Sequence, residues 1–392
     1  MNNIKLFCFT LLLVIVQTQT QAQRFSSVSI APASAIIELG SGETLKIGFD
    51  DLNDESLTLR YRLQHCNPDF KPSGLKDQEF ATGINEVDIP APELSFNTRV
   101  NYVHYGFEFP DNQVQPRVSG NYLIQIYDVD NPSEYLLEIP IRIYENKTTF
   151  DASVMQPRRV EYSRTKQELN ITAQVDPSIP VANTANLLLL VKQNQNIYTT
   201  RDIPLRSSNG NYLEYRYDDA LVFDGLNEFR NFDIRPITYT ARGVLSTDLI
   251  DGTRHITLYT DKSYKGYEYA DRDDINGQFA IKAAGLGNSD LEGDYAMVHF
   301  MLASPYIPNK DVYVMGDFTC WQKLPQYKMN YNSGKGEYQL DLPVKQGFYD
   351  YVYNVSSGES DNDFVNFENT FFDTENTYFI YLYYMRPGEI NY

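Results

Sequence analysis

Alternation of apolar and polar residues is the feature that most constrains how this chain folds. It runs through Leu57–Leu63 (LTLRYRL), Leu137–Ile143 (LEIPIRI) and Tyr349–Tyr353 (YDYVY). Because successive side chains of a β-strand point to opposite faces of the sheet, such segments are typical of strands with one buried face. No comparably long segment with a helical period follows the start of the chain, and Pro and Gly recur between the alternating segments, as they do in turns. The sequence therefore predicts an all-β protein.

The chain begins with an apolar run that is too short to cross a bilayer. Leu6–Val16 (LFCFTLLLVIV) follows the single charge of Lys5, and a polar stretch after it ends in Thr20-Gln-Ala22. A membrane span needs about 20 apolar residues, whereas a short run with a basic start and small residues at its end is typical of a cleaved secretory signal peptide. We therefore expect residues 1–22 to be a signal peptide. A membrane anchor is the competing interpretation.

The alternating segments fall into three blocks of similar length. The first block, residues 23–146, holds roughly seven of them, which is the number in an immunoglobulin-like sandwich. The second block is residues 147–265, and the acidic, tyrosine-rich stretch Tyr264–Asp274 marks its end. The third block is residues 266–392. We expect three consecutive immunoglobulin-like or early-set β-sandwich domains after the signal peptide.

Charge restricts the partners that the chain can bind. Its 52 acidic and 33 basic residues give a net charge of −19, which argues against nucleic acid and against anionic membrane surfaces. No segment after the first apolar run is hydrophobic enough for a transmembrane helix, so we expect no direct membrane insertion. The 31 Tyr and 22 Phe residues suit half-buried sheet faces and binding surfaces. Together these features favour an exported protein that binds another protein.

Motifs for catalysis or cofactor binding are missing from the sequence. It contains no nucleophile elbow, P-loop or dinucleotide-binding glycine motif. The four histidines do not stand at the spacing of zinc ligands: His65, His104, His255 and His299. We therefore expect no enzyme, no catalytic residue, no cofactor and no metal centre.

Two questions about sites stay open at this stage. A loose calcium site at Asp271, Asp273 and Asp274 competes with the interpretation of this stretch as a solvated acidic turn. Cys66 and Cys320, the cysteines that remain after the expected signal peptide, are either joined in a disulfide or present as two buried thiols.

A carbohydrate-binding function is the alternative that the sequence suggests. Gly316-Asp-Phe-Thr-Cys-Trp321, followed by Gly336-Glu-Tyr338 and Gly347-Phe-Tyr349, is similar to early-set sandwiches that accompany starch- and glycogen-active enzymes. In those modules aromatic rings stack on sugars, but the single Trp of this chain equally suits a core. The alternative is a carbohydrate-binding β-sandwich protein of the cell envelope. A tyrosine-rich outer-membrane barrel is disfavoured because the strands lack a sustained apolar outward face.

A set of ordered motifs covers nearly the whole chain after the expected signal peptide. In chain order they include Phe49-Asp-Asp-Leu52, His65-Cys-Asn-Pro-Asp69, Gly83-Ile-Asn-Glu86, Phe96-Asn-Thr98, Phe109-Pro110, Ser119-Gly-Asn-Tyr-Leu123, Asn227-Glu-Phe-Arg230, Asp274-Ile-Asn-Gly277, Glu375-Asn376 and Tyr383-Tyr384. Together they resemble the Type IX secretion system plug protein family of Bacteroidota. Phe70 departs from the family pattern, which has Trp there, but it keeps an aromatic side chain at that position.

The resemblance implies a function without catalysis. Proteins of this family are periplasmic and bind the giant Type IX outer-membrane translocon barrel, whose pore admits folded cargo. The resemblance implies that this chain seals the periplasmic mouth of the barrel when no cargo occupies it. A prefolded stack of β-sandwiches suits such a stopper, and reversible binding is favoured by a wet interface rather than a permanently apolar one.

Six polar residues in two of the motifs are our candidates for partner binding. They are expected at strand ends: His65, Asn67, Asp69, Asn227, Glu228 and Arg230. Because Asn and Asp commonly bond to their own backbone in turns, a purely structural role is the other interpretation of both motifs.

Overall fold

The computed structural model describes residues 24–386, except residues 54, 182 and 359. The signal peptide expected at residues 1–22 therefore lies outside the described residues. Strands dominate, and the α-helices have four residues each: α1 (Asp77–Phe80), α2 (Ser289–Glu292) and α3 (Val365–Glu368). No helix in the described part of the chain has the length and apolar character that crossing a membrane requires. The all-β prediction is confirmed.

The first sheet pair encloses a hydrophobic cluster between two sheets. Its strands are β1 (Phe25–Ala31), β2 (Ile36–Glu38), β3 (Leu45–Asp51), β4 (Leu59–Cys66), β6 (Val87–Asp88), β7 (Glu93–Leu94), β8 (Val103–Phe109), β10 (Gly120–Asp128) and β11 (Tyr135–Tyr144), with a small ribbon of β5 (Ala81–Gly83) and β9 (Val114–Pro116). The sheet orders are β1-β3-β8-β7 and β2-β11-β10-β4-β6. Leu59, Tyr61 and Leu63 alternate inward along β4 and meet Ile47 and Phe49 of the opposite sheet. Period-two burial thus produces the core that the sequence predicts.

The second sheet pair has its own hydrophobic cluster. Its strands are β12 (Thr148–Met155), β13 (Lys166–Val175), β14 (Leu187–Gln193), β15 (Arg201–Ile203), β16 (Ser207–Asn209), β17 (Tyr212–Tyr215), β18 (Val222–Asp224) and β29 (Tyr378–Tyr384). One sheet has the order β12-β13-β17-β16, with β18 also on β13, and the other has the order β15-β14-β29. Leu169 and Ile171 from the first sheet and Leu189 and Val191 from the second pack into this cluster.

The third sheet pair is formed by the part of the chain between β18 and β29. Its strands are β19 (Arg230–Asp233), β20 (Val244–Ile250), β21 (Thr253–Leu258), β22 (Asp261–Lys262), β23 (Phe279–Ile281), β24 (Tyr295–Ala303), β25 (Asp311–Met315), β26 (Asn330–Asn332), β27 (Glu337–Lys345) and β28 (Gly347–Ser356). The sheet orders are β19-β28-β23, with β25 also on β28, and β20-β21-β24-β27-β26, with β22 also on β24. Val298, Phe300, Tyr351 and Tyr353 belong to the cluster between these sheets.

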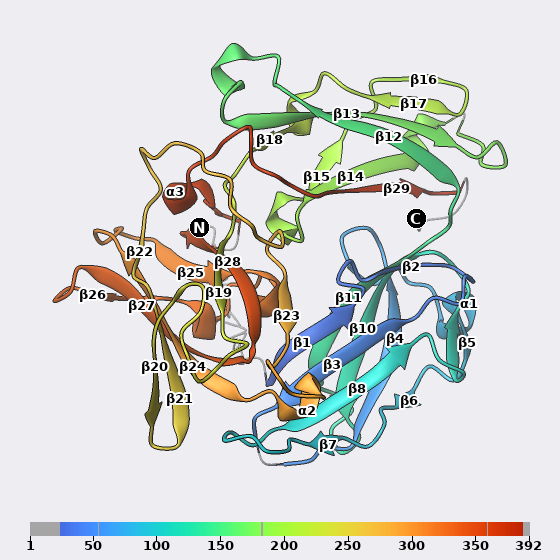
Figure 1. The fold of residues 1–392 in the computed structure, drawn as a ribbon. Coiled ribbons are helices and arrows are strands. Elements are labelled where there is room, and N and C mark those ends of the chain that lie inside the picture. The colour runs from blue at the N-terminus through green and yellow to red at the C-terminus, as the bar shows by residue number, and fades with distance from the viewer. Residues whose placement is uncertain (1–23, 54, 182, 359, 387–392) are drawn as a thin grey trace, which may run out of the picture.

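The strand pairing differs from the expected division at residues 265/266. Strands β19 to β21, expected in the middle block, pair with β28 and β24 of the last block. The last described strand, β29, instead pairs with β14, from Leu187 opposite Tyr384 to Gln193 opposite Tyr378. The third sheet pair is therefore inserted into the second, as the red strand beside the green ones in Figure 1 makes visible. Alternation identifies strands but not their partners, because any two strands with apolar faces satisfy the same pattern.

Candidate functional site

His65, the first of the six predicted binding residues, lies in the interior of the first sheet pair. Its side chain is about 1% exposed. The ring Nδ1 lies 2.7 Å from Ser73 Oγ, and Nε2 lies 3.3 Å from the carbonyl oxygen of Ser119. Burial lowers the pKa of His65, which the hydrogen bond to Ser119 only partly opposes. A neutral ring that donates to the carbonyl and accepts from the Ser73 hydroxyl fits this environment.

Asn67 and Asp69 form the turn that follows β4. The carbonyl of Asn67 accepts a hydrogen bond from Asn121 Nδ2 at 3.2 Å, and its backbone N–H donates to the carbonyl of Lys71. Asp69 accepts from the Lys71 backbone N–H and pairs with the Lys71 ammonium at 2.8 Å. The bonds of Asp69 are local, whereas Asn121 holds the turn from the neighbouring strand β10. Asp69 is the exposed member of the motif, so it is the residue of the three that a partner reaches.

The second predicted motif is buried where the chain passes from the second to the third sheet pair. Asn227, Glu228 and Arg230 are 4–6% exposed. The two segments that connect the sheet pairs touch here, and a Cβ atom added to Gly225 would lie 1.8 Å from the carbonyl oxygen of Phe371. Only glycine allows this close approach of two backbones.

Side-chain hydrogen bonds tie these connecting segments together. Asn227 Nδ2 donates to the carbonyl of Glu368 at 2.8 Å, and the Glu228 carboxylate accepts from the Tyr269 hydroxyl at 2.5 Å and from the Glu375 N–H at 3.2 Å. Burial raises the pKa of Glu228, although its hydrogen bond with Tyr269 opposes the shift. The motif is therefore part of the interior. Partner binding by these side chains stays a prediction.

Arg230 is the centre of a buried charge network. Its Nε donates to Glu368 Oε2 and its Nη1 to Asp261 Oδ1, both at 2.8 Å. The hydroxyls of Tyr351 and Tyr353 each donate to the other oxygen of Asp261 at 2.7 Å. Burial disfavours the charge of Arg230, but the two carboxylates outweigh burial and hold its pKa well above the usual value. The network fastens β19 to β22 and to helix α3.

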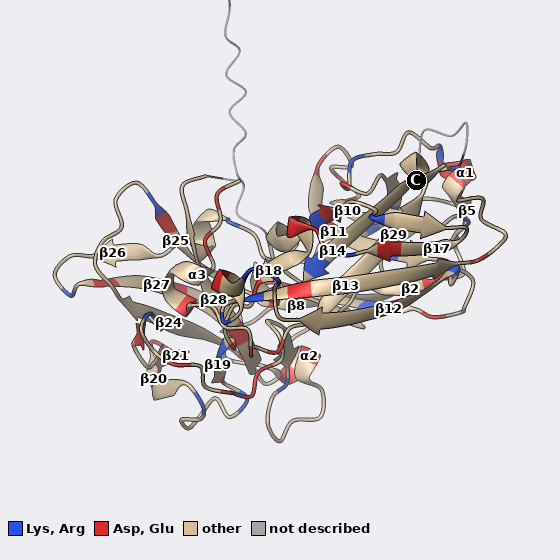
Figure 2. Cartoon of the chain, turned by 90° about the horizontal axis from the view of Figure 1, so that it is seen from above, with Lys and Arg blue, Asp and Glu red and all other residues tan. Residues whose placement is uncertain are grey.

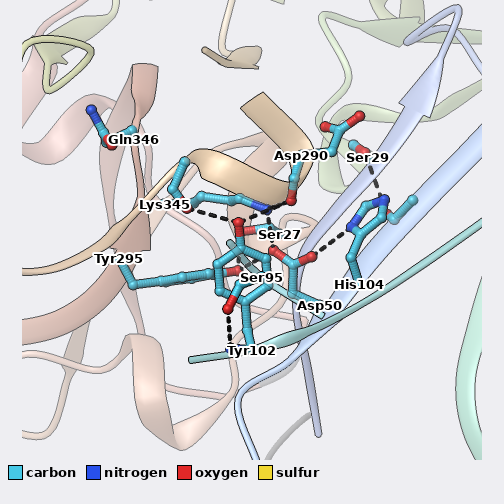
Figure 3. Close-up of polar contacts among 12 residues, drawn as sticks. Ser27, Ser29, Asp50, Ser95, Tyr102, His104, Asp290, Tyr295, Lys345 and Gln346 are labelled. Carbon is cyan, nitrogen blue, oxygen red and sulfur yellow. Dashed lines mark hydrogen bonds and ion pairs between the residues drawn. The ribbon is translucent and has the colours of Figure 1, made fainter. Parts of the chain in front are cut away.

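A second buried network joins the first sheet pair to the third (Figure 3). Lys345 Nζ donates to Asp50 Oδ2 at 2.7 Å and to the carbonyl of Asp290 at 2.6 Å. The Tyr295 hydroxyl donates to the same oxygen of Asp50 at 2.7 Å, and His104 Nδ1 lies 2.7 Å from the other oxygen. Asp50, Tyr295 and Lys345 are each 1% exposed. The charges of Asp50 and Lys345 therefore pair with each other in the interior of the protein.

The composition of this network resembles a proton-transfer site, but its location does not. Burial lowers the pKa of Lys345, opposed by Asp50, and raises that of Tyr295 well above its usual value. Perturbed Lys and Tyr groups beside a carboxylate are typical of general acid–base sites in clefts. Here the groups are enclosed between two sheet pairs, so no substrate reaches them. The arrangement holds two parts of the molecule in one orientation.

The first and second sheet pairs meet through stacked aromatic rings. The guanidinium of Arg142, on β11, lies 4.9 Å from the ring centre of Phe70 and 4.2 Å from that of Tyr381, on β29. The Tyr383 hydroxyl donates to Asn121 Oδ1 at 2.9 Å. Phe70, the residue that departs from the family pattern, thus takes part in this junction as an aromatic surface.

Trp321 is buried where the second and third sheet pairs meet. It is 3% exposed, and its Nε1 donates to Asp317 Oδ1 at 2.6 Å. Burial raises the pKa of Asp317 to about 7 and lowers that of Lys192, on β14, to about 7. Lys192 Nζ donates to Gln195 and lies 5.0 Å from the ring centre of Phe379. Trp321 therefore packs in a core rather than offering a platform for sugars.

Metal and disulfide sites receive no support from the geometry. Within the part of the chain that the structure describes, no group of three or more His, Cys, Asp or Glu side chains is arranged to hold a metal ion. Asp274 instead accepts hydrogen bonds from the backbone N–H groups of Phe229 and Asn276. Cys66 and Cys320 are not joined in a disulfide, and burial raises the pKa of the Cys66 thiol to about 11.

Comparison with known proteins identifies the first sheet pair. Residues 14–145 match the family described as Type 9 secretion system plug protein 1st domain. A hypothetical protein from Parabacteroides merdae ATCC 43184, whose crystal structure is known, is 26% identical, with a TM-score of 0.90 over 94% of this chain and 95% of that chain. No curated protein matches the chain. The resemblance seen in the sequence is confirmed over residues 14–145, which match the first domain of the Type 9 secretion system plug protein family.

Proposed function

We propose that this chain is a non-enzymatic periplasmic plug. It binds the giant outer-membrane translocon barrel of the Type IX secretion system and seals the periplasmic mouth of the barrel when no cargo occupies the pore. The observation that carries the proposal is the match of residues 14–145 to the first domain of the plug family. A role in type IX secretion also suggests a location in the cell envelope, which the signal peptide expected at residues 1–22 would allow.

The internal junctions support a role as a rigid stopper. A body that closes a wide pore must keep its shape without help from the pore. Buried charge networks around Asp50 and Arg230 fix the sheet pairs against one another. Such networks favour one relative orientation of the sheet pairs, because a shifted but still buried junction would leave a charge without its partner. A net charge of −19 opposes adhesion to anionic lipid around the barrel.

Deletion of the gene tests the proposal in cells. An unplugged barrel should admit molecules that are normally excluded, so we expect the deletion strain to become sensitive to a large glycopeptide antibiotic. A plasmid copy of the full chain should restore resistance, and the tagged chain should copurify with the barrel. Unchanged permeability together with no copurification would contradict the proposal.

The carbohydrate-binding alternative loses the observation that motivated it. It depended on Trp321 as a stacking platform, and the Trp321 side chain is 3% exposed.

A further inference from the structure

Strand β12 is an open edge of the second sheet pair. Among the described residues it pairs with β13 alone, in unbroken register from Thr148 opposite Val175 to Met155 opposite Glu168. The backbone N–H and C=O groups on its other side therefore have no strand partner. Figure 2 shows β12 along the margin of the molecule, without a Lys or Arg. A row of this kind is a template for an additional strand.

The other long edge strands of the described chain are protected. Strand β1 bulges between Ser26 and Ser29, and the Ser27 hydroxyl is hydrogen-bonded to Tyr295 of the third sheet pair. Strand β20 bulges between Val244 and Ser246, and β29 stacks against the first sheet pair through Tyr381. A bulge, or another part of the protein packed against the edge, prevents a further strand from pairing there. Strand β12 has no bulge in its register, no Pro and a single charge, Asp151.

The side chains of β12 define what fits against it. Phe150, Ala152 and Val154 lie opposite β13 residues of the hydrophobic cluster and therefore face the same side as that cluster. Val154 is nevertheless 47% exposed, and Ala152 is also exposed. The opposite sheet therefore leaves Ala152 and Val154 of this apolar row exposed. The other face of the strand, Thr149, Asp151 and Ser153, is polar.

We propose that β12 docks an extended segment of the partner by strand addition. The inference rests on the proposed function, so the partner segment belongs to the periplasmic side of the translocon barrel. The segment carries apolar residues at alternate positions, which cover Ala152 and Val154. It has no acidic residue opposite Asp151, because like charges directly across a strand pair are destabilising. Main-chain hydrogen bonds supply affinity, and the alternate side chains supply specificity.

Two matched variants of the chain spanning residues 23–392 test this edge. Ala152→Lys with Val154→Lys places charges on the apolar row of β12. Leu245→Lys with Leu249→Lys does the same on β20, where the two leucines are 51% and 48% exposed. The long stem of Lys keeps its charge in water at exposed positions, so both variants should fold, which circular dichroism checks. The probe is the purified translocon barrel in detergent micelles.

The expected result is a loss of affinity confined to β12. The β12 variant should bind the barrel at least about tenfold more weakly, whereas the β20 variant should stay within roughly twofold of the unmodified chain. Hydrogen exchange supplies an independent readout on the unmodified chain. Backbone amides within residues 148–155 should exchange more slowly in the complex, because strand addition bonds the outward-facing groups.

The possible failures are distinguishable. Equal affinity of the β12 variant, or unchanged exchange at residues 148–155, would overturn the docking edge and leave the plug function standing. An unmodified chain that does not bind the barrel would overturn the plug function and, with it, the partner named here. Slow exchange at residues 148–155 without the barrel, lost on dilution, would show that a second copy occupies the edge and would also overturn the proposal.

Discussion

The first sheet pair is held on two sides by different kinds of contact. Toward the third sheet pair the contact is ionic and buried, because Asp50 and Lys345 are each 1% exposed and paired at 2.7 Å. Toward the second sheet pair it is aromatic, because Arg142 stacks between Phe70 and Tyr381. The ionic junction fails abruptly when one partner is lost, since the remaining charge is then buried alone. The aromatic junction weakens gradually, ring by ring.

Removal of the Lys345 charge should have the largest effect on the free energy of unfolding. Lys345→Met leaves the Asp50 carboxylate buried without its cation, which costs about 3–5 kcal/mol for a broken buried pair. We expect a loss of that size in the free energy of unfolding, measured by urea denaturation with circular dichroism. The double variant Asp50→Asn with Lys345→Met should recover part of the loss. A loss below about 1 kcal/mol in the single variant would show that the two junctions do not differ in kind.

The sequence predicts the strands of this molecule better than its junctions. Leu137–Ile143 alternates and lies within β11, as expected from period-two burial. Lys345 instead follows Val344 at an outward position of β27, and nothing local to it predicts burial. It is buried because the first sheet pair, which contributes Asp50, packs over that outer face. Such packing depends on residues nearly three hundred positions apart, which a periodic pattern cannot relate.

The predicted binding residues show the same limit. Asn227 precedes strand β19 and Arg230 begins it, and polar residues at such positions are usually exposed. They are buried because two chain segments cross there, one entering and one leaving the inserted third sheet pair. The insertion itself follows from β29 pairing with β14. Asp69 stays on the surface, where its hydrogen bond and its ion pair are both with the neighbouring Lys71.

Lys192 is buried on β14, and the charge of Asp317 only partly offsets the burial of its ammonium group. Its pKa of about 7 in the folded chain lies below the ordinary value of 10.5. The cost of burying its charge is therefore complete below pH 7 and declines as the pH rises toward the ordinary pKa. Lys192→Met should raise the free energy of unfolding by about 1–4 kcal/mol at low pH.

The pH dependence distinguishes this effect from simple repacking. The gain from Lys192→Met should be largest at about pH 6 and shrink by about pH 10, where the lysine is neutral in the folded chain and begins to lose its proton in the unfolded chain. Thermal unfolding at both pH values measures the difference. A gain that is equal at the two values would assign it to hydrophobic packing, and a loss at both would mean that the contacts of Lys192 with Gln195 and Phe379 outweigh its burial.

Arg142→Ala should weaken the aromatic junction by a smaller amount. Stacking of a guanidinium on a ring contributes about 0.5–1 kcal/mol where water has access, so two rings give about 1–2 kcal/mol. Hydrogen exchange of the β29 amides should accelerate, because Tyr381 loses its contact with the first sheet pair. Arg62→Ala is the matched control, since Arg62 stacks on Tyr135 within the first sheet pair and not across a junction. Equal acceleration in both variants would contradict a specific role for Arg142.

Asp69→Ala should have the smallest effect on stability. Its ion pair with Lys71 is open to water, with the two side chains 54% and 80% exposed, and such pairs contribute little to folding. We expect no measurable change in the midpoint of thermal unfolding. Asp69 is therefore the candidate, of the six, whose role in binding can be tested without disturbing the fold. If the loop contacts the barrel, affinity falls while the midpoint stays constant. If affinity is also unchanged, the turn closed by Asp69 is structural, and β12 is left as the site where contact with the partner must be sought.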